Sequence, residues 1–323
     1  MLSPIWGANL KGASRNLLTL TIRPIKPAAM IALSALAFPN VSPEIFTISL
    51  FGMEFALRWY ALAYITGIAL GWWMIAKSLK QPAVWPANSA PMTAKQLEDL
   101  MTWIIAGVIL GGRFGYVLFY RFSYYAQNPL EVLQVWEGGM SFHGGFLGVI
   151  VATYLYSRHQ KLPLGSVADC LAMVAPLGLL LGRLANFING ELWGRVSDVP
   201  WAVVFPSEAA QQCLLPICAR HPSQLYEAAM EGVILGLIML WLVLRAGALK
   251  RPWTLAGTFF AGYGVSRFIV EFFRQPDAQF ISEGNPLGLA FHVNGWGLTM
   301  GQTLSLPMIL IGLVLVLWPR RKT

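Results

Sequence analysis

Apolar residues along the chain gather into long runs that short polar segments separate. A membrane-spanning helix needs roughly 20 mostly apolar residues, and several runs approach that length. Seven such runs lie at residues 59–75, 97–119, 142–156, 167–187, 227–244, 254–273 and 301–318. The pattern predicts an all-α polytopic membrane protein with about seven transmembrane helices, of which the third is short enough to be distorted.

The positive charges between these runs are distributed unevenly, which predicts an orientation. Cytoplasmic loops of membrane proteins carry an excess of Lys and Arg. Alternate connections and the C-terminal tail hold eleven: Lys77, Lys80, Lys95, Arg158, Lys161, Arg245, Lys250, Arg251, Arg320, Arg321 and Lys322. The opposite connections hold four, among acidic residues: Arg121, Arg195, Arg220 and Arg274. We expect a cytoplasmic C-terminus and, with seven spans, an N-terminus outside.

The N-terminal segment departs from this charge rule. It carries four basic residues and no acidic residue: Lys11, Arg15, Arg23 and Lys26. A start codon upstream of the natural start near Met30, a disordered extension and a cleaved targeting piece are alternative explanations. We expect residues 1–42 to be an N-terminal extension and residues 43–323 to form one integral-membrane domain.

The composition excludes an ordinary soluble domain. Hydrophobic residues make up 56% of the chain and charged residues 12%, whereas about 25% of a soluble domain is charged. The orientation explains the net charge of +8, so no nucleic-acid partner is expected. The three cysteines form no metal-binding motif, but Cys213 and Cys218, in an outward connection, could pair in an oxidising compartment.

Three arginines lie within the apolar runs, at Arg113, Arg183 and Arg267. Each costs about 2.5 to 3.5 kcal/mol near the bilayer centre unless a partner or water compensates its charge. Four intramembrane carboxylates are available as partners: Asp169, Glu227, Glu231 and Glu271. We expect a carboxylate to neutralise Arg113. For Arg267, pairing with Glu271 four residues later and binding of an anionic ligand remain alternatives.

A dense polar run follows Arg183 at the outward end of its span. It contains Asn186, Asn189, Glu191 and Arg195, and such side chains are costly to expose to lipid. They predict a hydrated pocket, in which a guanidinium and amides could hold phosphate oxygens. A helix end capped by Asn, with Arg reaching to the interface, would explain only one or two of them.

His143 stands between glycines at the start of the third run, where a ligand could approach the imidazole closely. A His with a pKa of about 6.5 is a suitable proton acceptor near neutral pH, and a structural role is the alternative. The chain lacks G-x-S-x-G and H-E-x-x-H, so a hydrolase or metalloprotease has no support. An enzyme here would need a nucleophile carried by its substrate.

Residues 182–194, with the sequence GRLANFINGELWG, match the pattern G-R-x-[GA]-N-F-x-N-x-E-x-x-G at every fixed position. This pattern is the signature of the bacterial prolipoprotein diacylglyceryl transferases. Further matching segments are residues 58–60, 111–113, 141–145, 221–227 and 263–277. The chain therefore resembles this family from about residue 43 onward, with a connection at residues 282–297 longer than the family leads us to expect.

The resemblance implies transfer of the sn-1,2-diacylglyceryl group from phosphatidylglycerol to the lipobox cysteine of a prolipoprotein. The products would be a thioether and glycerol 1-phosphate, in the first step of bacterial lipoprotein maturation. The partners would be phosphatidylglycerol, the prolipoprotein signal peptide and the membrane, with no cofactor or metal. The site would face the outer leaflet of the bacterial cytoplasmic (inner) membrane.

The resemblance also implies roles for individual residues. His143, Tyr263 and Arg267 would be catalytic. The phosphatidylglycerol-binding residues would be Arg183, Asn186, Glu191, Gly194 and Tyr60. To these we add Asn189, which lies in the same polar run. Guanidinium groups suit a leaving phosphate whose charge grows in the transition state. A thiol with a pKa of about 8.5 needs a base or a positive field, for which His143, Tyr263 and the arginines remain alternatives.

Two other functions are compatible with buried arginines. A transporter or flippase of an anionic amphiphile would use them for binding, but such folds often show two related halves, which the sequence lacks. A scaffold or receptor for lipid-modified proteins would need them only for pairing. Transfer of a diacylglyceryl unit to a lipobox peptide distinguishes the enzyme from both.

Overall fold

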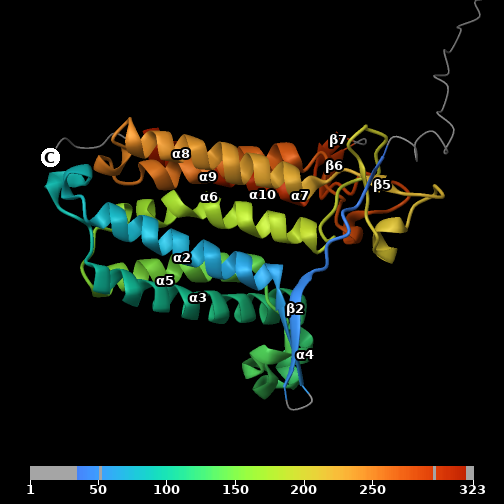
Figure 1. Cartoon of the computed structure of the whole chain (residues 1–323), viewed down its shortest axis with the longest axis horizontal. Coiled ribbons are helices and arrows are strands. Elements are labelled where there is room, and N and C mark those ends of the chain that lie inside the picture. Colours follow the sequence, from blue (N-terminus) through green and yellow to red (C-terminus); the bar gives the residue numbers. More distant parts are fainter. Residues whose placement is uncertain (1–34, 51–52, 294–295, 318–323) are drawn as a thin grey trace, which may run out of the picture.

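A computed structural model of the chain describes residues 35–50, 53–293 and 296–317. Residues 1–34 of the expected N-terminal extension and the basic tail at residues 320–322 lie outside this part. The long helices run side by side in one bundle, with their connections at its two ends (Figure 1). One end holds residues 35–50, 53–58, 121–141, 189–222, 271–293 and 296–299, and we call it the loop end.

The fold is mostly helical. The long helices are α2 (Trp59–Leu79), α3 (Ala94–Tyr120), α5 (Phe142–His159), α6 (Leu164–Ile188), α9 (Thr254–Val270) and α10 (Met300–Leu317). A further helix consists of α7 (Ser223–Glu227), the π-helical η6 (Ala228–Ile234) and α8 (Leu235–Leu244). The short helical elements are η1 (Pro82–Val84), η2 (Pro86–Asn88), α4 (Phe122–Gln127), η3 (Pro129–Leu133), η4 (Val135–Glu137), η5 (Glu208–Gln211), η7 (Ala248–Lys250) and η8 (Ala278–Phe280).

Among the described residues, five helices are long and apolar enough to cross a membrane, namely α2, α3, α6, the helix from Ser223 to Leu244, and α10. They confirm the predicted class, a mostly helical protein of the membrane type. The other two predicted runs also form helices, of 18 residues in α5 and 17 in α9. In the bundle α5 packs against α3, and α9 packs against α10.

Glycines allow two of these helix pairs to approach closely. A Cβ at Gly111 of α3 would lie 2.9 Å from the Cα of Gly148 in α5, and one at Gly115 would lie 2.8 Å from the Cα of Gly144. Between α9 and α10, a Cβ at Gly257 would lie 2.8 Å from the carbonyl oxygen of Gly312. Small residues at such contacts let membrane helices pack by van der Waals attraction.

Small strands join the loop-end segments. They are β1 (Leu36–Ala37), β2 (Glu44–Leu50), β3 (Met53–Arg58), β4 (Val203–Val204), β5 (Ala219–Arg220), β6 (Phe291–Val293) and β7 (Trp296–Leu298). β1 pairs in parallel with β4, which pairs antiparallel with β5, whereas β2–β3 and β6–β7 are antiparallel pairs. Cys213 and Cys218 form a disulfide just before β5. Part of the segment preceding residue 43 is therefore incorporated into the loop end.

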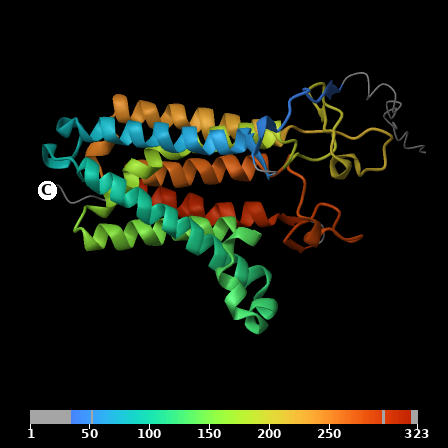
Figure 2. The same ribbon diagram turned by 60° about the horizontal axis from the view of Figure 1, so that its bottom comes forward.

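The segment from Arg121 to Gly139, which contains α4, η3 and η4, projects sideways from the bundle (Figures 1 and 2). We call it the arm. Several of its large apolar side chains are exposed: Phe122, Leu130, Leu133, Val135 and Trp136. The arm leads directly into Ser141, whose hydroxyl oxygen caps α5 by accepting a hydrogen bond from the amide of Gly144 at 3.2 Å.

Candidate active site

Glu227, at the end of α7, contacts three arginines from different parts of the chain. Its Oε1 accepts hydrogen bonds from Nη1 of Arg267 at 3.0 Å and from Nη1 of Arg274 at 2.7 Å. Its Oε2 lies 3.1 Å from Nη1 of Arg183. The Glu227 side chain is fully buried. One carboxylate thus joins α6, α7 and the C-terminal end of α9.

Two further carboxylates extend this group. Oε2 of Glu231 lies 3.2 Å from Nη2 of Arg183. Oε2 of Glu271 lies 2.8 Å from Nη2 of Arg267 and 3.5 Å from Nε of Arg274. We call the six residues the arginine–glutamate cluster: Arg183, Arg267, Arg274, Glu227, Glu231 and Glu271. Its three guanidinium groups and three carboxylates balance in charge when all are ionised.

The cluster is asymmetric in its access to the surroundings. Glu227 and Glu231 have no exposed side-chain surface, whereas the side chains of Arg183 and Arg267 are 17% and 20% exposed. A buried ion pair is stable only when its geometry compensates the loss of hydration. The acids therefore lie behind the arginines, and it is the guanidinium groups that an incoming anion would meet first.

Local features of the helices place these side chains. α6 lies in the middle of the bundle, next to the helix that contains η6 (Figure 1). A Cβ at Gly232 in η6 would lie 2.7 Å from Cβ of Leu180 in α6, so glycine permits the close approach. The π-helical winding of η6 departs from the usual helical period just where Glu231 turns towards α6. Such π-helical segments are frequent at functional sites.

The polar run after Arg183 separates into different groups. Asn186 and Asn189 donate hydrogen bonds to Oε1 of Glu191, at 2.8 and 3.4 Å. Arg195 donates instead to the carbonyl of Arg274, at 2.9 Å. The structure thus brings both asparagines together with Glu191, while the guanidinium of Arg183 belongs to the arginine–glutamate cluster.

The two predicted tyrosines lie beside these groups. Tyr263 of α9 stacks on Phe259 and is close enough to Arg183, Arg267 and Glu231 to interact with their charges. Tyr60 of α2 accepts a hydrogen bond from the Tyr64 hydroxyl at 3.4 Å. Tyr64 in turn is within electrostatic range of Arg183 and Glu191.

Gly194 has a packing role. Its amide donates to the carbonyl of His221 at 2.9 Å, and it forms an antiparallel bridge with Arg274. A Cβ at this position would lie 2.8 Å from both the Cβ and the carbonyl oxygen of His221. Only glycine fits here without movement of the backbone, and the bridge holds the segment that carries Arg274.

His143 is the second residue of α5, and its side chain is exposed. Its ring meets that of Phe142 edge to face, with 5.7 Å between the centroids. Within the described ranges, no hydrogen bond or ion pair joins His143 to the arginine–glutamate cluster. The structure therefore brings Arg183, Arg267 and Tyr263 together but does not bring His143 into contact with them.

Arg113 contradicts its sequence-based prediction. We expected a carboxylate partner, but the buried guanidinium donates to backbone carbonyls of the arm, at 2.8 Å to Val132, 2.6 Å to Gly138 and 2.5 Å to Glu131. Its Cζ also lies 5.0 Å from the ring centre of Tyr125. The prediction was wrong because carbonyls of a distant turn can satisfy an arginine as well as an acid can.

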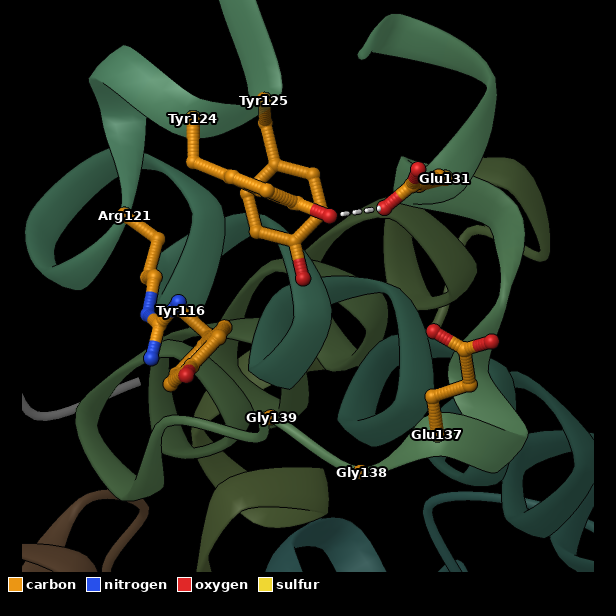
Figure 3. A pocket seen from close by; sticks show the side chains of 8 residues that line it. All are labelled: Tyr116, Arg121, Tyr124, Tyr125, Glu131, Glu137, Gly138 and Gly139. Atoms are coloured by element: carbon orange, nitrogen blue, oxygen red, sulfur yellow. Dashed lines mark hydrogen bonds between the residues drawn. The ribbon is translucent and has the colours of Figure 1, made fainter.

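A cleft of about 220 Å³ lies at the base of the arm (Figure 3). Its lining residues are Tyr116, Arg121, Tyr124, Tyr125, Glu131, Glu137, Gly138 and Gly139. The Tyr124 hydroxyl donates to Oε2 of Glu131 at 2.6 Å, and this bond raises the pKa of Tyr124. None of these residues belongs to the arginine–glutamate cluster, and the carboxylate of Glu131 is already engaged.

The sequence reasoning missed two features of the site. The charge pattern predicts that Arg274 lies in an outward connection, although its spacing of three residues from Glu271 indicates that the two side chains can pair, as they do at 3.5 Å. The sequence offers Glu227 as one of several counterions, although it is the carboxylate that joins all three arginines.

Among the residues that the structure describes, no group of three or more His, Cys, Asp or Glu could hold a metal ion.

Comparison with known proteins places the chain in a family. A profile of the prolipoprotein diacylglyceryl transferases matches residues 46–318. A protein of Roseobacter denitrificans is 62% identical over 285 residues, which are 88% of this chain and 97% of that protein. A protein of Ruegeria pomeroyi is 63% identical over 289 residues, covering 89% and 98%, and one of Cereibacter sphaeroides is 58% identical over 291 residues, covering 90% and 99%. All three are named phosphatidylglycerol–prolipoprotein diacylglyceryl transferase. The chain belongs to the prolipoprotein diacylglyceryl transferase family.

Proposed function

We propose that this protein transfers the sn-1,2-diacylglyceryl group of phosphatidylglycerol to the thiol of the lipobox cysteine in a prolipoprotein. The reaction forms a thioether and releases glycerol 1-phosphate. The observation that carries the proposal is the pair Arg183 and Arg267, whose partly exposed guanidinium groups flank one buried carboxylate in a family of this activity.

The two guanidinium groups bind the phosphate of the lipid. When sulfur attacks the glycerol carbon and the carbon–oxygen bond breaks, a phosphodiester with one negative charge becomes a phosphomonoester approaching two. Guanidinium groups fixed beside these oxygens stabilise the transition state more than the bound substrate, which accelerates the reaction. Arg183 thus binds the lipid, and Arg267, with Tyr263 beside it, acts on the leaving phosphate.

The group of Asn186, Asn189 and Glu191 completes the headgroup site next to Arg183, and Tyr60 borders it from α2. Gly194 contributes by holding the backbone that carries Arg274. This arrangement is supported by the hydrogen bonds of the asparagines to Glu191 and by the lack of space for a side chain at Gly194.

His143 is the proposed acceptor of the thiol proton. Its exposed imidazole at the start of α5 is accessible to a peptide, and the arriving substrate would have to connect it to the arginines. We expect His143→Gln to slow transfer while leaving phosphatidylglycerol binding largely intact. Binding and transfer measured on the same preparation test this, since an equal loss of both indicates a structural histidine.

The helices and the charge distribution support a membrane arrangement that we infer for this protein. Seven spans, including α5 and α9, cross the bacterial cytoplasmic (inner) membrane, with residues 43–323 as the integral domain and residues 1–42 as an extension. The end of the bundle opposite the loop end carries Lys80, Lys161 and Arg251, and such basic residues favour the cytoplasm. In this proposal the loop end faces outward and the headgroup site lies at the outer leaflet.

The decisive experiment supplies the purified protein with phosphatidylglycerol vesicles and a synthetic lipobox peptide. We expect the peptide mass to increase by one diacylglyceryl unit, and a peptide with serine in place of the cysteine to stay unmodified. Movement of phosphatidylglycerol between leaflets without any change of peptide mass would support a flippase instead. Binding of the peptide with neither effect would support a scaffold.

A further inference from the structure

The charges of the arginine–glutamate cluster are already balanced before an anionic ligand binds. Three guanidinium groups already face three carboxylates, and Glu227 and Glu231 are fully buried. A phosphodiester that binds to Arg183 and Arg267 adds one negative charge to a cluster whose three guanidinium groups are all paired with carboxylates. An unpaired charge in a buried site is costly, so the added charge has to be compensated.

The three carboxylates are not equally well paired. Glu227 contacts three arginines and Glu271 contacts two. Of the described side chains, Arg183 alone forms an ion pair with Glu231, and it does so through Oε2. Oε1 of Glu231 is buried and accepts no hydrogen bond. Glu231 is therefore the carboxylate that loses most when Arg183 turns towards a ligand.

The surroundings of Glu231 point the same way. The charged and titratable groups near it are Arg183 on α6, Glu227 on α7, and Arg267 and Tyr263 on α9. The adjoining α8 is entirely apolar, from Leu235 to Leu244. Once the guanidinium groups bind a phosphate, the remaining neighbours of Glu231 are a second carboxylate, apolar side chains and the Tyr263 phenol. Among the described residues Tyr263 donates no hydrogen bond to Glu231, so none of these groups compensates the negative charge.

We propose that Glu231 takes up a proton when the phosphate of an anionic phospholipid binds at Arg183, so that lipid binding is coupled to the uptake of one proton. The proton comes from solvent and resides on the carboxylate, and no covalent bond changes in this step. The bound site then contains three positive groups, two carboxylates and one phosphodiester, which restores the balance. The inference rests on the proposed function, because it assigns the lipid phosphate to this site.

The test measures binding of short-chain phosphatidylglycerol to the full-length protein in detergent. Titration calorimetry in buffers of different ionisation enthalpy gives the number of protons taken up for each lipid bound. We expect about one proton, and an affinity that falls about tenfold per pH unit wherever free Glu231 is ionised. In this proposal Glu231 takes up its proton when it loses its ion pair with Arg183. Lipid binding without proton uptake therefore overturns the inference.

Glu231→Gln tests the residue, because the amide has the shape of the carboxyl group without the charge. The variant should bind the lipid with no proton uptake and with an affinity independent of pH. A matched control is Asp169→Asn in α6, since Asp169 is also a fully buried carboxylate, and its Oδ1 accepts from the amide of Ala256 at 2.8 Å. The control should retain proton uptake. Unchanged uptake in Glu231→Gln overturns the assignment.

Infrared spectroscopy of the unmodified protein provides a second measurement, independent of how well the variant folds. Addition of an ether-linked phosphatidylglycerol, which has no ester carbonyl to obscure the region, should produce the absorption band of a newly protonated carboxyl group, and its absence contradicts the inference. The outcomes also separate this inference from the proposed function. Proton-coupled binding without diacylglyceryl transfer refutes only the transferase, whereas transfer with proton-independent binding refutes only the role of Glu231. Failure of phosphatidylglycerol to bind refutes both.

Discussion

Arg113 and Arg183 lie in predicted membrane spans, yet different chemistry neutralises them. Arg113 on α3 donates to three carbonyl oxygens of the arm at 2.5 to 2.8 Å and is almost completely buried. Arg183 on α6 faces two carboxylates and remains 17% exposed. The first guanidinium fastens one segment to another, whereas the second has partners whose charge can change.

The difference lies in what the partners can do. A carbonyl oxygen does not take up a proton in the physiological pH range, so the environment of Arg113 is fixed once the arm has folded. A carboxylate can be protonated or can give up its arginine to a competing anion. Buried arginines of a membrane protein are therefore better distinguished by their partners than by their position in a span.

The largest expected effect concerns the arginines that are paired with carboxylates. Arg183→Gln and Arg267→Gln should each lower the rate of diacylglyceryl transfer by about 100-fold or more, because each removes a charged donor to the leaving phosphate. Transfer to a lipobox peptide measures this. Thioether formation at the normal rate in well-folded variants would refute the proposed site.

Arg158→Gln provides a matched control for these variants. Arg158 is exposed near the end of α5, away from the loop end. The substitution removes one positive charge from the protein without touching the cluster. Transfer by this control should stay close to normal, which would exclude a general effect of net charge on membrane insertion or lipid attraction.

The second prediction concerns Arg113, whose partners are backbone carbonyls. Arg113→Gln should lower the free energy of unfolding by on the order of 3 kcal/mol, because several buried carbonyls lose a charged donor. Thermal unfolding in detergent measures the loss, and the activity of each folded molecule should fall much less than in the Arg183 variant. Arg113→Lys should restore only part of the stability, since an ammonium group cannot reach carbonyls in several directions. A stable but inactive Arg113→Gln protein would contradict the comparison.

The sequence predicted the parts of this molecule that depend on local patterns. All seven apolar runs form helices, because a run of that length satisfies its own backbone hydrogen bonds. The motif that begins at Gly182 indicated Arg183 and Asn186 as candidate binding residues. The spacing of four residues between Arg267 and Glu271 indicated that their side chains share one helix face. Their ion pair at 2.8 Å confirms that second pattern.

Other features depend on contacts between distant segments, which no local pattern encodes. The partners of Arg113 are main-chain carbonyls at residues 131–138, and every residue type has a carbonyl. The π-helical winding of η6 changes the period on which face assignments rest, so the meeting of Glu227 and Glu231 with Arg183 could not be derived from spacing. Arg274 joins the cluster from the turn that follows α9, and its partner Glu227 lies 47 residues earlier in the chain.

A third prediction tests how firmly the arginine–glutamate cluster is held. Gly194→Ala should cost about 1 to 3 kcal/mol, since the new Cβ meets His221 and backbone that cannot move easily. The displaced bridge should also shift Arg274 and lower the rate of transfer. Gly178→Ala in α6 is the control, because a Cβ there meets nothing within 4 Å. Equal stability and activity of both variants would show that Gly194 is not a packing constraint.

The smallest expected effect is the pH dependence of stability that His221 contributes. The backbone carbonyl of His221 accepts the hydrogen bond from the Gly194 amide. Burial lowers the pKa of the His221 imidazole, although Asp198 opposes this. Its Nδ1 lies 3.0 Å from the Tyr226 hydroxyl, which accepts a hydrogen bond from Trp201 at 2.7 Å and so can donate to a neutral imidazole. The folded state therefore favours neutral His221.

The sign of the pH effect follows from this lowered pKa. On acidification the unfolded chain binds a proton at His221 first, so stability contributed by the neutral ring is present near pH 7 and is lost as the pH falls below about 6.5. Because the ring is only partly buried and solvent screens it, the loss should stay below about 0.5 kcal/mol. Comparing thermal unfolding at about pH 7.5 and about pH 5.5, we expect His221→Gln to show a smaller decrease than the unmodified protein. An identical decrease in both would show that other groups, and not the segment that supports Arg274, account for the acid sensitivity of the site.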